Sequence, residues 1–359
     1  MLRIACFSNC GNNSNTIYTC GNKLAKGIRI YECNSNSSFY DFSLQFTNNE
    51  VRDCYKGIEI QRSLVPNIHS NLFENNIIGI HFSSNHVFAC TPFPITIFIP
   101  NNFHGIYDNI FRTNGSVKIP YSGIQYNSYL HTKFNPLSNK SLTSPYQTGF
   151  AGIVAENVVG LNIGRVQKHF NLFESLNAGV LCYGSDVYIL NSKFKSLVNH
   201  LNFGVNYTGI YAERSRITGK GRIKVRGLTS PNIQDPSFDY MACGIHCYDL
   251  EDADISNIKV KNVAYGVQAD VYHSFRTTKH FKVKNSQFEN ASINNFVPVK
   301  IVDNTFDNFH ATISDNAMTV SNVNSFANSI GIYAVKTTGS FQNSLLHIKN
   351  NVLTGKLQE

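Results

Sequence analysis

The sequence predicts an all-β solenoid, a stack of short strands built from one repeated unit. A pattern of Gly, then Ile or Val, then a variable residue, then an apolar or small residue recurs ten times among 359 residues. Alternation with a period of two is typical of a strand with one buried face. One such strand cannot bury that face alone, so ten copies predict coils stacked on their neighbours. The copies begin at Gly27, Gly57, Gly79, Gly123, Gly152, Gly179, Gly209, Gly244, Gly266 and Gly331.

A second pattern precedes the glycine strands. Asn49-x-Val51, Asn71-x-Phe73 and Asn171-x-Phe173 each begin eight residues before a repeat glycine. The composite unit is Ile-x-x-Asn-x-Phe-x5-Gly-Ile-x-Ala, which holds two or three short strands. The wide gaps between glycines predict degenerate coils, one near Asn109-x-Phe111 and two near Phe288 and Phe306. We therefore expect about a dozen coils of roughly 20–30 residues.

The composition fits strands joined by tight turns. Charged residues make up 15% of the chain, below the usual ~25%, whereas 42% of the residues are hydrophobic. Polarity comes instead from Ser and 45 Asn, and Asn tolerates the left-handed backbone region that tight turns need. The net charge of +8 favours acidic partners such as nucleic acid, an anionic polysaccharide or an anionic surface, although solubility explains it equally well.

The run Ile68-x-x-Asn71-x-Phe73-x5-Gly79-Ile80 resembles the right-handed parallel β-helix repeat of the pectate-lyase-like superfamily, and the resemblance covers residues 24–355. It implies that equivalent residues stack into ladders and that inward Asn side chains bond to one another at a turn. A leucine-rich repeat would show more Leu, and a β-propeller a period of ~40–50 residues. We assign 24–359 to a parallel β-helix with loop insertions near 129–148 and 213–242, and 1–23 to an N-terminal cap.

Cysteines and carboxylates give no clear metal site. Cys182 and Cys247 occupy the third position after a repeat glycine, which predicts small core residues, and the N-terminal cysteines allow one or two disulfides. Cys243-x3-Cys247 lacks the second pair that zinc needs. Glu251, Asp252 and Asp254 cluster, but their spacing fits no EF-hand loop and indicates a turn. We expect no cofactor, with calcium left open.

The variable positions of the glycine strands predict a functional face. If these strands form one parallel sheet, positions two and four after each glycine point outward, with adjacent coils ~4.8 Å apart. Aromatic faces stack on sugar rings, while carboxylates and His bind hydroxyls or move protons. A solvated face with ordinary cross-strand pairs is the alternative. The candidate catalytic residues are Glu213, Asp270 and His246, and the candidate substrate-binding residues are Tyr211, Tyr248, Gln268, Arg222 and Lys224.

The geometry of these candidates allows an enzymatic reading. Glu213 and Asp270 would lie two coils apart, roughly 10 Å, near the upper limit for an inverting glycosidase. Arg222-Ile223-Lys224 looks like the Arg-Ile-Lys element of polygalacturonases, but the accompanying Asn-Thr-Asp, Asp-Asp and Gly-His-Gly motifs are absent. The basic run from Arg214 to Arg226 is typical of a half-buried strand with a basic outer face. The alternative is that it forms a binding site for a polyuronide or a sulfated glycan.

Two hypotheses follow for function. The first is a secreted or cell-surface β-helix module, structural or adhesive, that contacts carbohydrate and forms part of a longer chain. The second is a polysaccharide lyase or glycosidase acting on an acidic polysaccharide. No DNA- or RNA-binding motif and no apolar run of ~18 residues is present, so we expect neither nucleic acid as a partner nor a membrane span. The start of the chain is too short for a complete signal peptide, and no cap follows Val352.

Overall fold

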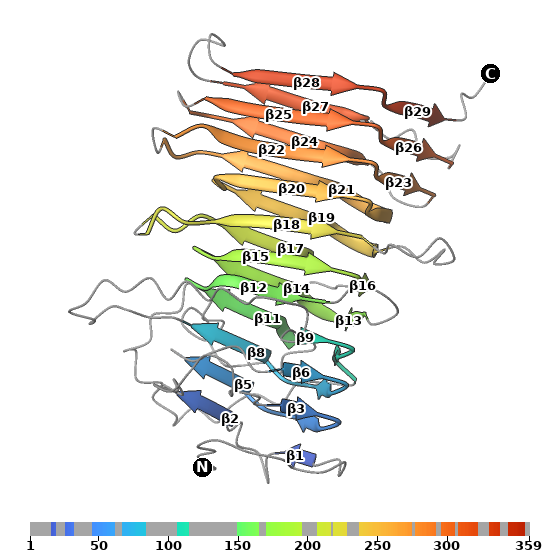
Figure 1. The fold of residues 1–359 in the computed structure, drawn as a ribbon. Coiled ribbons are helices and arrows are strands. Elements are labelled where there is room, and N and C mark those ends of the chain that lie inside the picture. The colour runs from blue at the N-terminus through green and yellow to red at the C-terminus, as the bar shows by residue number, and fades with distance from the viewer. Residues whose placement is uncertain are drawn as a thin grey trace, which may run out of the picture.

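The protein is an all-β parallel solenoid in which short strands stack from the N-terminal to the C-terminal end (Figure 1). Among the residues described, every strand pairing is parallel and there is no helix. The computed structural model describes residues 16–18, 26–31, 45–61, 67–83, 106–114, 149–164, 170–195, 207–216, 218–227, 237–274, 277–291, 296–305, 308–321, 330–337 and 344–355.

Each coil contributes a strand to three columns. The glycine column contains the strands of the glycine repeat: β2 (Lys26–Tyr31), β5 (Lys56–Gln61), β8 (Ile78–Ser83), β11 (Gly149–Glu156), β14 (Leu176–Tyr183), β17 (Thr208–Glu213), β19 (Phe238–Tyr248), β21 (Lys259–Val271), β24 (Val297–Asp303) and β27 (Ile332–Lys336).

The facing column lies across the core from the glycine column and forms a separate ten-stranded sheet. Its strands are β3 (Gln45–Thr47), β6 (Asn67–His69), β9 (Ile106–Tyr107), β12 (Val159–Ile163), β15 (Asp186–Leu190), β18 (Arg222–Arg226), β20 (Asp252–Ser256), β22 (Lys279–Lys284), β25 (Phe309–Ser314) and β28 (Leu345–Lys349).

The phenylalanine column joins the other two and carries the Asn-x-Phe pattern. The first halves of β19 and β21 belong to it, because these strands run on into the glycine column. Its other strands are β1 (Thr16–Tyr18), β4 (Glu50–Arg52), β7 (Leu72–Glu74), β10 (Ile110–Arg112), β13 (Asn171–Glu174), β16 (Ser192–Lys195), β23 (Gln287–Asn290), β26 (Ala317–Val320) and β29 (Val352–Gly355).

The repeat glycines are required by close packing. The phenylalanine rings form a stack with centroids 4.8–4.9 Å apart. Each ring lies against a glycine of the preceding coil. A Cβ atom on Gly179 would lie 2.3 Å from Cδ1 of Phe194 and 2.6 Å from the carbonyl oxygen of Gly209. The glycine column can therefore approach the rings only because it lacks side chains at these positions. The stacked rings are Phe73, Phe111, Phe173, Phe194 and Phe238.

An asparagine ladder closes the turn before the phenylalanine column. The backbone N–H of Asn71 donates to Oδ1 of Asn109 (3.1 Å), and the N–H of Asn109 donates to Oδ1 of Asn171 (3.1 Å). The Nδ2 group of Asn109 donates to the carbonyl oxygens of Ile68 and Tyr107, both at 2.9 Å. Each buried amide thus satisfies backbone groups of two coils, which matches what the family resemblance implied.

Most residues of the described chain that adopt a left-handed turn conformation without being glycine are Asn or Asp. The residue before the ladder position takes a positive φ angle in most coils, and Asn and Asp tolerate this conformation better than other non-glycine residues. The residues in this conformation at this turn include Asn48, Ser70, Asp108, Asn191, Asn257, Asn285, Asp315 and Asn350.

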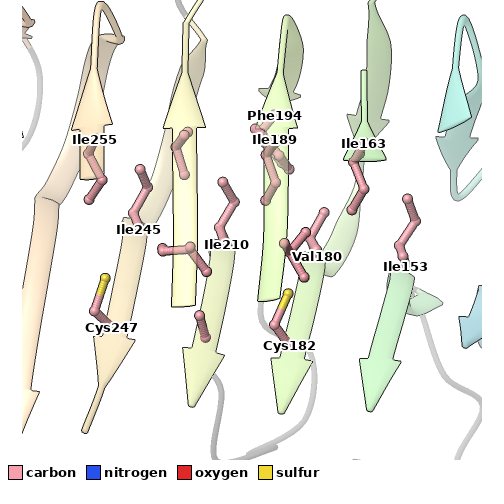
Figure 2. Close-up of a cluster of buried hydrophobic side chains, with 14 of the residues drawn as sticks. Ile153, Ile163, Val180, Cys182, Ile189, Phe194, Ile210, Ile245, Cys247 and Ile255 are labelled. Carbon is pink, nitrogen blue, oxygen red and sulfur yellow. The ribbon is translucent and has the colours of Figure 1, made fainter. Parts of the chain in front are cut away.

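The core lies between the glycine and facing columns. Figure 2 shows Ile153, Ile210 and Ile245 of the glycine column opposite Ile163, Ile189 and Ile255 of the facing column. All are almost completely buried. Cys182 and Cys247 also belong to this core, as the sequence predicted.

Two sequence expectations about the repeat need correction, and a third, the predicted strand at Gly123, lies outside the described residues. β8 pairs directly with β11. The Asn109-x-Phe111 segment forms β10 in the same coil as β11. The gap from Gly266 to Gly331 holds one further glycine-column strand, β24, instead of two. Pro298 occupies the glycine position there.

The ends and insertions differ in part from expectation. β1 pairs with β4 in the register of the repeat, although it lies in the segment assigned to a cap. The insertion at 129–148 lies outside the described residues, whereas 213–242 contains β18 of the facing column. At the C-terminal end, Leu345, Ile348, Val352 and Leu353 are 50–61% exposed. The search for a helix long and apolar enough to cross a membrane found none in the described part of the chain.

Gly179→Ala should destabilise the solenoid by about 1–3 kcal/mol or more, because the new methyl group overlaps the ring of Phe194. Urea unfolding followed by circular dichroism would measure the loss. Gly355→Ala is the matched control, since nothing lies within 4 Å of its added Cβ. Wild-type stability for Gly179→Ala would contradict the packing argument.

Candidate functional site

The glycine column brings six of the predicted site residues together. Tyr211, His246 and Gln268 lie in one row across β17, β19 and β21. The next row contains Glu213, Tyr248 and Asp270. Their chain neighbours Ile210, Ala212 and Ile245 are in the core, so the six side chains point away from it. We call these six residues the polar patch.

The carboxylates of the polar patch are held by specific hydrogen bonds. Oδ2 of Asp270 contacts Nε2 of His246 at 2.9 Å and accepts a bond from Nε2 of Gln268 at 2.6 Å. The Tyr211 hydroxyl donates to Oε2 of Glu213 at 2.9 Å. Because a carboxylate only accepts, Nε2 of His246 carries the proton and Nδ1 is left as the acceptor of the neutral ring.

Burial and charge set the protonation states in the patch. Burial raises the pKa of Asp270, but hydrogen bonds from His246 and Gln268 and the charge of Lys300 outweigh it, so the pKa lies below its usual range. Burial and the charge of Glu213 raise the pKa of Tyr211. Burial and Asp249 raise that of Tyr248. At neutral pH the patch therefore offers an ionised Asp270 beside two protonated phenols.

Aromatic rings extend the patch beyond the predicted residues. Tyr248 stacks on Tyr272 with centroids 5.7 Å apart, and Tyr272 is 48% exposed. His273 lies beside Tyr248, and its Nδ1 contacts Oδ2 of Asp249 at 2.5 Å. Oδ1 of Asp249 accepts the backbone N–H groups of Tyr272 and His273. The sequence analysis missed these three residues, and the aromatic pair directly after β21 was the signal that could have found them.

The outer face is more buried than the solvated sheet face that the sequence allowed. Tyr211, Glu213 and Asp270 are at most 9% exposed, while His246, Tyr248 and Gln268 are partly exposed. Toward the N-terminal end, outward-pointing Val154 and Leu181 belong to a second apolar cluster. In the described part of the chain, the outer face of the glycine column is therefore more accessible from β19 toward the C-terminal end, where Tyr333 on β27 is 40% exposed.

A second polar cluster on the same column is closed to ligands. Nζ of Lys56 contacts Oε1 of Glu59 at 2.7 Å, and Nε2 of His81 contacts Oε2 of Glu156 at 3.2 Å. All four residues are at most 4% exposed. Breaking a buried charge pair by removing one partner is strongly destabilising, so we assign this cluster a structural role.

The structure does not place Arg222 and Lys224 with the other candidates. They lie on the outer side of β18 in the facing column, while Ile223 between them and Val225 after them point into the core. Arg222 binds Glu251 through two hydrogen bonds of 3.0 and 2.9 Å. The segment predicted as an acidic turn is instead mostly strand β20. No group of His, Cys, Asp or Glu suited to a metal ion occurs among the described residues.

The described cysteines are unsuited to covalent chemistry. Cys54, Cys182, Cys243 and Cys247 are free and buried. Burial raises the pKa of Cys182 to about 12, so its reactive thiolate is scarce at neutral pH. The N-terminal cysteines that could form disulfides lie outside the described residues.

Asp270→Asn should reduce stability at neutral pH and make little difference in acid. A carboxyl whose folded pKa is lowered stabilises the fold above its unfolded pKa of about 3.9, and this contribution is lost as pH falls through the folded value. Urea unfolding of both proteins at neutral pH and near pH 3 would measure this difference. An equal difference at the two pH values would show that the ionised carboxylate contributes nothing.

Comparison of the chain with protein-family models, with curated proteins and with solved structures found no match.

Proposed function

We propose that the chain is a secreted or cell-surface β-helix module that binds carbohydrate through the polar patch and acts in a structural or adhesive role. The observation that carries this proposal is the stacked Tyr248–Tyr272 pair beside the His246–Asp270 hydrogen bond. A sugar presents a C–H face and a rim of hydroxyls, so it needs both kinds of group at one place.

Each group of the polar patch can interact with a specific part of a sugar. The exposed ring of Tyr272 can stack on a pyranose face. The protonated Tyr248 phenol donates hydrogen bonds, and Nδ1 of His246 accepts them. Oδ1 of Asp270 is buried and has no hydrogen-bond donor, so it offers a further acceptor to a small donor that reaches it. Few, converging polar groups beside aromatic rings are typical of binding sites.

The resemblance to the pectate-lyase-like superfamily supports the same proposal. In that superfamily carbohydrate sites often lie on an outer sheet face lined by stacked columns. Its known enzyme motifs are largely missing from this sequence, which favours binding over turnover. Secretion or surface display is consistent with the low charge and the high Asn and Ser content.

The second candidate function is cleavage of an acidic polysaccharide by a lyase or glycosidase reaction. The His246–Asp270 pair favours it, because a carboxylate that orients an imidazole is a common arrangement for proton transfer. Glu213 and Asp270 lie two strands apart, roughly 10 Å by strand spacing, near the largest acid–base separation of inverting glycosidases.

Tyr272→Ala should weaken glycan binding about three- to tenfold, because one aromatic contact contributes about 0.5–1.5 kcal/mol. Tyr248→Ala should weaken glycan binding further, since it also removes the ring on which Tyr272 stacks. The measurement is binding to an array of neutral, uronic and sulfated glycans at low and moderate salt. Tyr240→Ala is the control, because Tyr240 is 52% exposed on β19 but lies at the turn between the phenylalanine and glycine columns, where its φ is 54°.

The same array separates the two functions. Binding without product release supports the non-catalytic module. Product release that stops in Asp270→Asn and His246→Gln, with binding retained, supports the enzyme. Wild-type protein that binds no glycan on the array would overturn both.

A further inference from the structure

The outer side of the facing column carries basic residues in a regular arrangement. Three strands of this column, β18, β22 and β28, each contribute a pair of basic residues at alternate positions, and β18 also carries Arg222. The register aligns them in two rows that run along the solenoid. The first row is Lys224, Asp254, Lys282, Thr312 and His347, and the second is Arg226, Ser256, Lys284, Ser314 and Lys349.

We infer that this face binds an extended anionic polysaccharide that carries one acidic group on every second sugar. The basic pairs occur on alternate strands, so neighbouring pairs lie about 10 Å apart. Such a polymer repeats its charge once per disaccharide. The inference does not depend on the proposed function, because this face lies across the core from the polar patch.

The charge available to a ligand is concentrated at β22 and β28. Lys282 and Lys349 are exposed and Lys284 is partly exposed. In the described part of the chain, no carboxylate forms an ion pair with any of these three lysines, although the charge of Lys349 helps to lower the pKa of Asp315. Three unpaired ammonium groups within two strand steps create a positive potential on one flat face.

The N-terminal part of the rows is already neutralised or covered. Arg226 contacts both oxygens of Asp254, at 3.1 and 2.7 Å. Nζ of Lys224 lies 5.4 Å from the ring centroid of Tyr188. These residues therefore form the margin of the site, and its centre lies between β22 and β28.

The groups between the cations suit a sugar polymer. On β25, Thr312 and Ser314 are partly exposed, so their hydroxyls lie between the lysines of β22 and Lys349. Hydroxyls can donate to and accept from the hydroxyls of a glycan. His280 and His310, in edge contact at 5.5 Å, lie at the side of Lys282 and add ring nitrogens.

Nucleic acid fits this face less well. Along the axis of a DNA duplex the phosphates of each strand recur at about 3.4 Å, which does not match cations about 10 Å apart. Sequence-independent binding of single strands also uses exposed aromatic rings for base stacking. On this face the Tyr188 ring lies beneath Lys224.

The test uses three probes: hyaluronan oligosaccharide, in which every second sugar carries a carboxylate; oligogalacturonate, in which every sugar does; and single-stranded DNA. Fluorescence polarisation with labelled probes at low and moderate salt gives the affinities. We expect hyaluronan to bind best per charge. Lys282→Gln/Lys284→Gln/Lys349→Gln should lose more than about tenfold in affinity, with a shallower salt dependence.

The matched control removes three charges from the phenylalanine column, as Lys193→Gln/Lys195→Gln/Lys261→Gln. It should retain hyaluronan binding, and so should Tyr248→Ala, which reports on the polar patch alone. If the first triple variant fails to fold by circular dichroism, the single variants Lys282→Gln and Lys349→Gln replace it, each with a smaller loss. An equal loss in the control, tighter binding of oligogalacturonate or DNA per charge, or no binding would overturn the inference.

Discussion

The contact between the repeat glycines and the stacked phenylalanine rings is the constraint on which the rest of the structure depends. The ring of Phe194 occupies the space that a side chain at Gly179 would need. The same contact recurs in successive coils, so it fixes how closely the glycine column approaches the phenylalanine column. Once this distance is constant, each coil stacks on the next in one register. Residues far apart in the sequence, such as Tyr211 and His246 at a separation of 35 positions, then become neighbours.

The asparagine ladder adds a polar constraint at the turn before the phenylalanine column of the same coils. Asn109 forms hydrogen bonds with groups of the coils before and after it, so both the oxygen and the nitrogen of its side-chain amide have partners. A buried hydrogen bond contributes about 1 kcal/mol net, but a buried donor left without a partner costs more. The ladder therefore favours one stacking order through the cost of breaking it.

The sequence predicted the register of the polar patch because the core pattern has a period of two. Ile210 and Ile245 must point inward, which leaves Tyr211 and His246 on the outer side. The pattern carries no information about what covers that outer side, so the burial of Glu213 and Asp270 could not be predicted. Likewise, Arg222 and Lys224 could be placed on a strand but not on a particular column.

The exceptions in the glycine pattern follow from the same packing. Pro298 occupies a glycine position in β24, and sequence reasoning passed over it. In the next coil Met318 replaces the phenylalanine ring, as its pairing with Phe288 shows. A flexible thioether can move aside where a ring cannot. Gly244 and Gly331 are nevertheless present where Val260 and Leu353 follow, so a phenylalanine in the next coil is one reason for a glycine and close backbone approach is another.

The stacking of coils alone does not explain why the cations of the facing column lie on alternate strands. Like charges on adjacent strands repel, so placing basic pairs on alternate strands relieves repulsion within any parallel sheet. If relief were the whole reason, acidic residues on the strands between would serve best. β20 does carry Asp254, which binds Arg226. β25, however, carries Thr312 and Ser314. No carboxylate of the described residues forms an ion pair with Lys282, Lys284 or Lys349, although the charges of Lys284 and Lys349 help to lower the pKa values of Asp254 and Asp315. The facing column thus neutralises the basic residue Arg226 on β18 but leaves the lysines on β22, two strands later, without an ion pair among the described residues. This arrangement leaves a surface that suits an external anion.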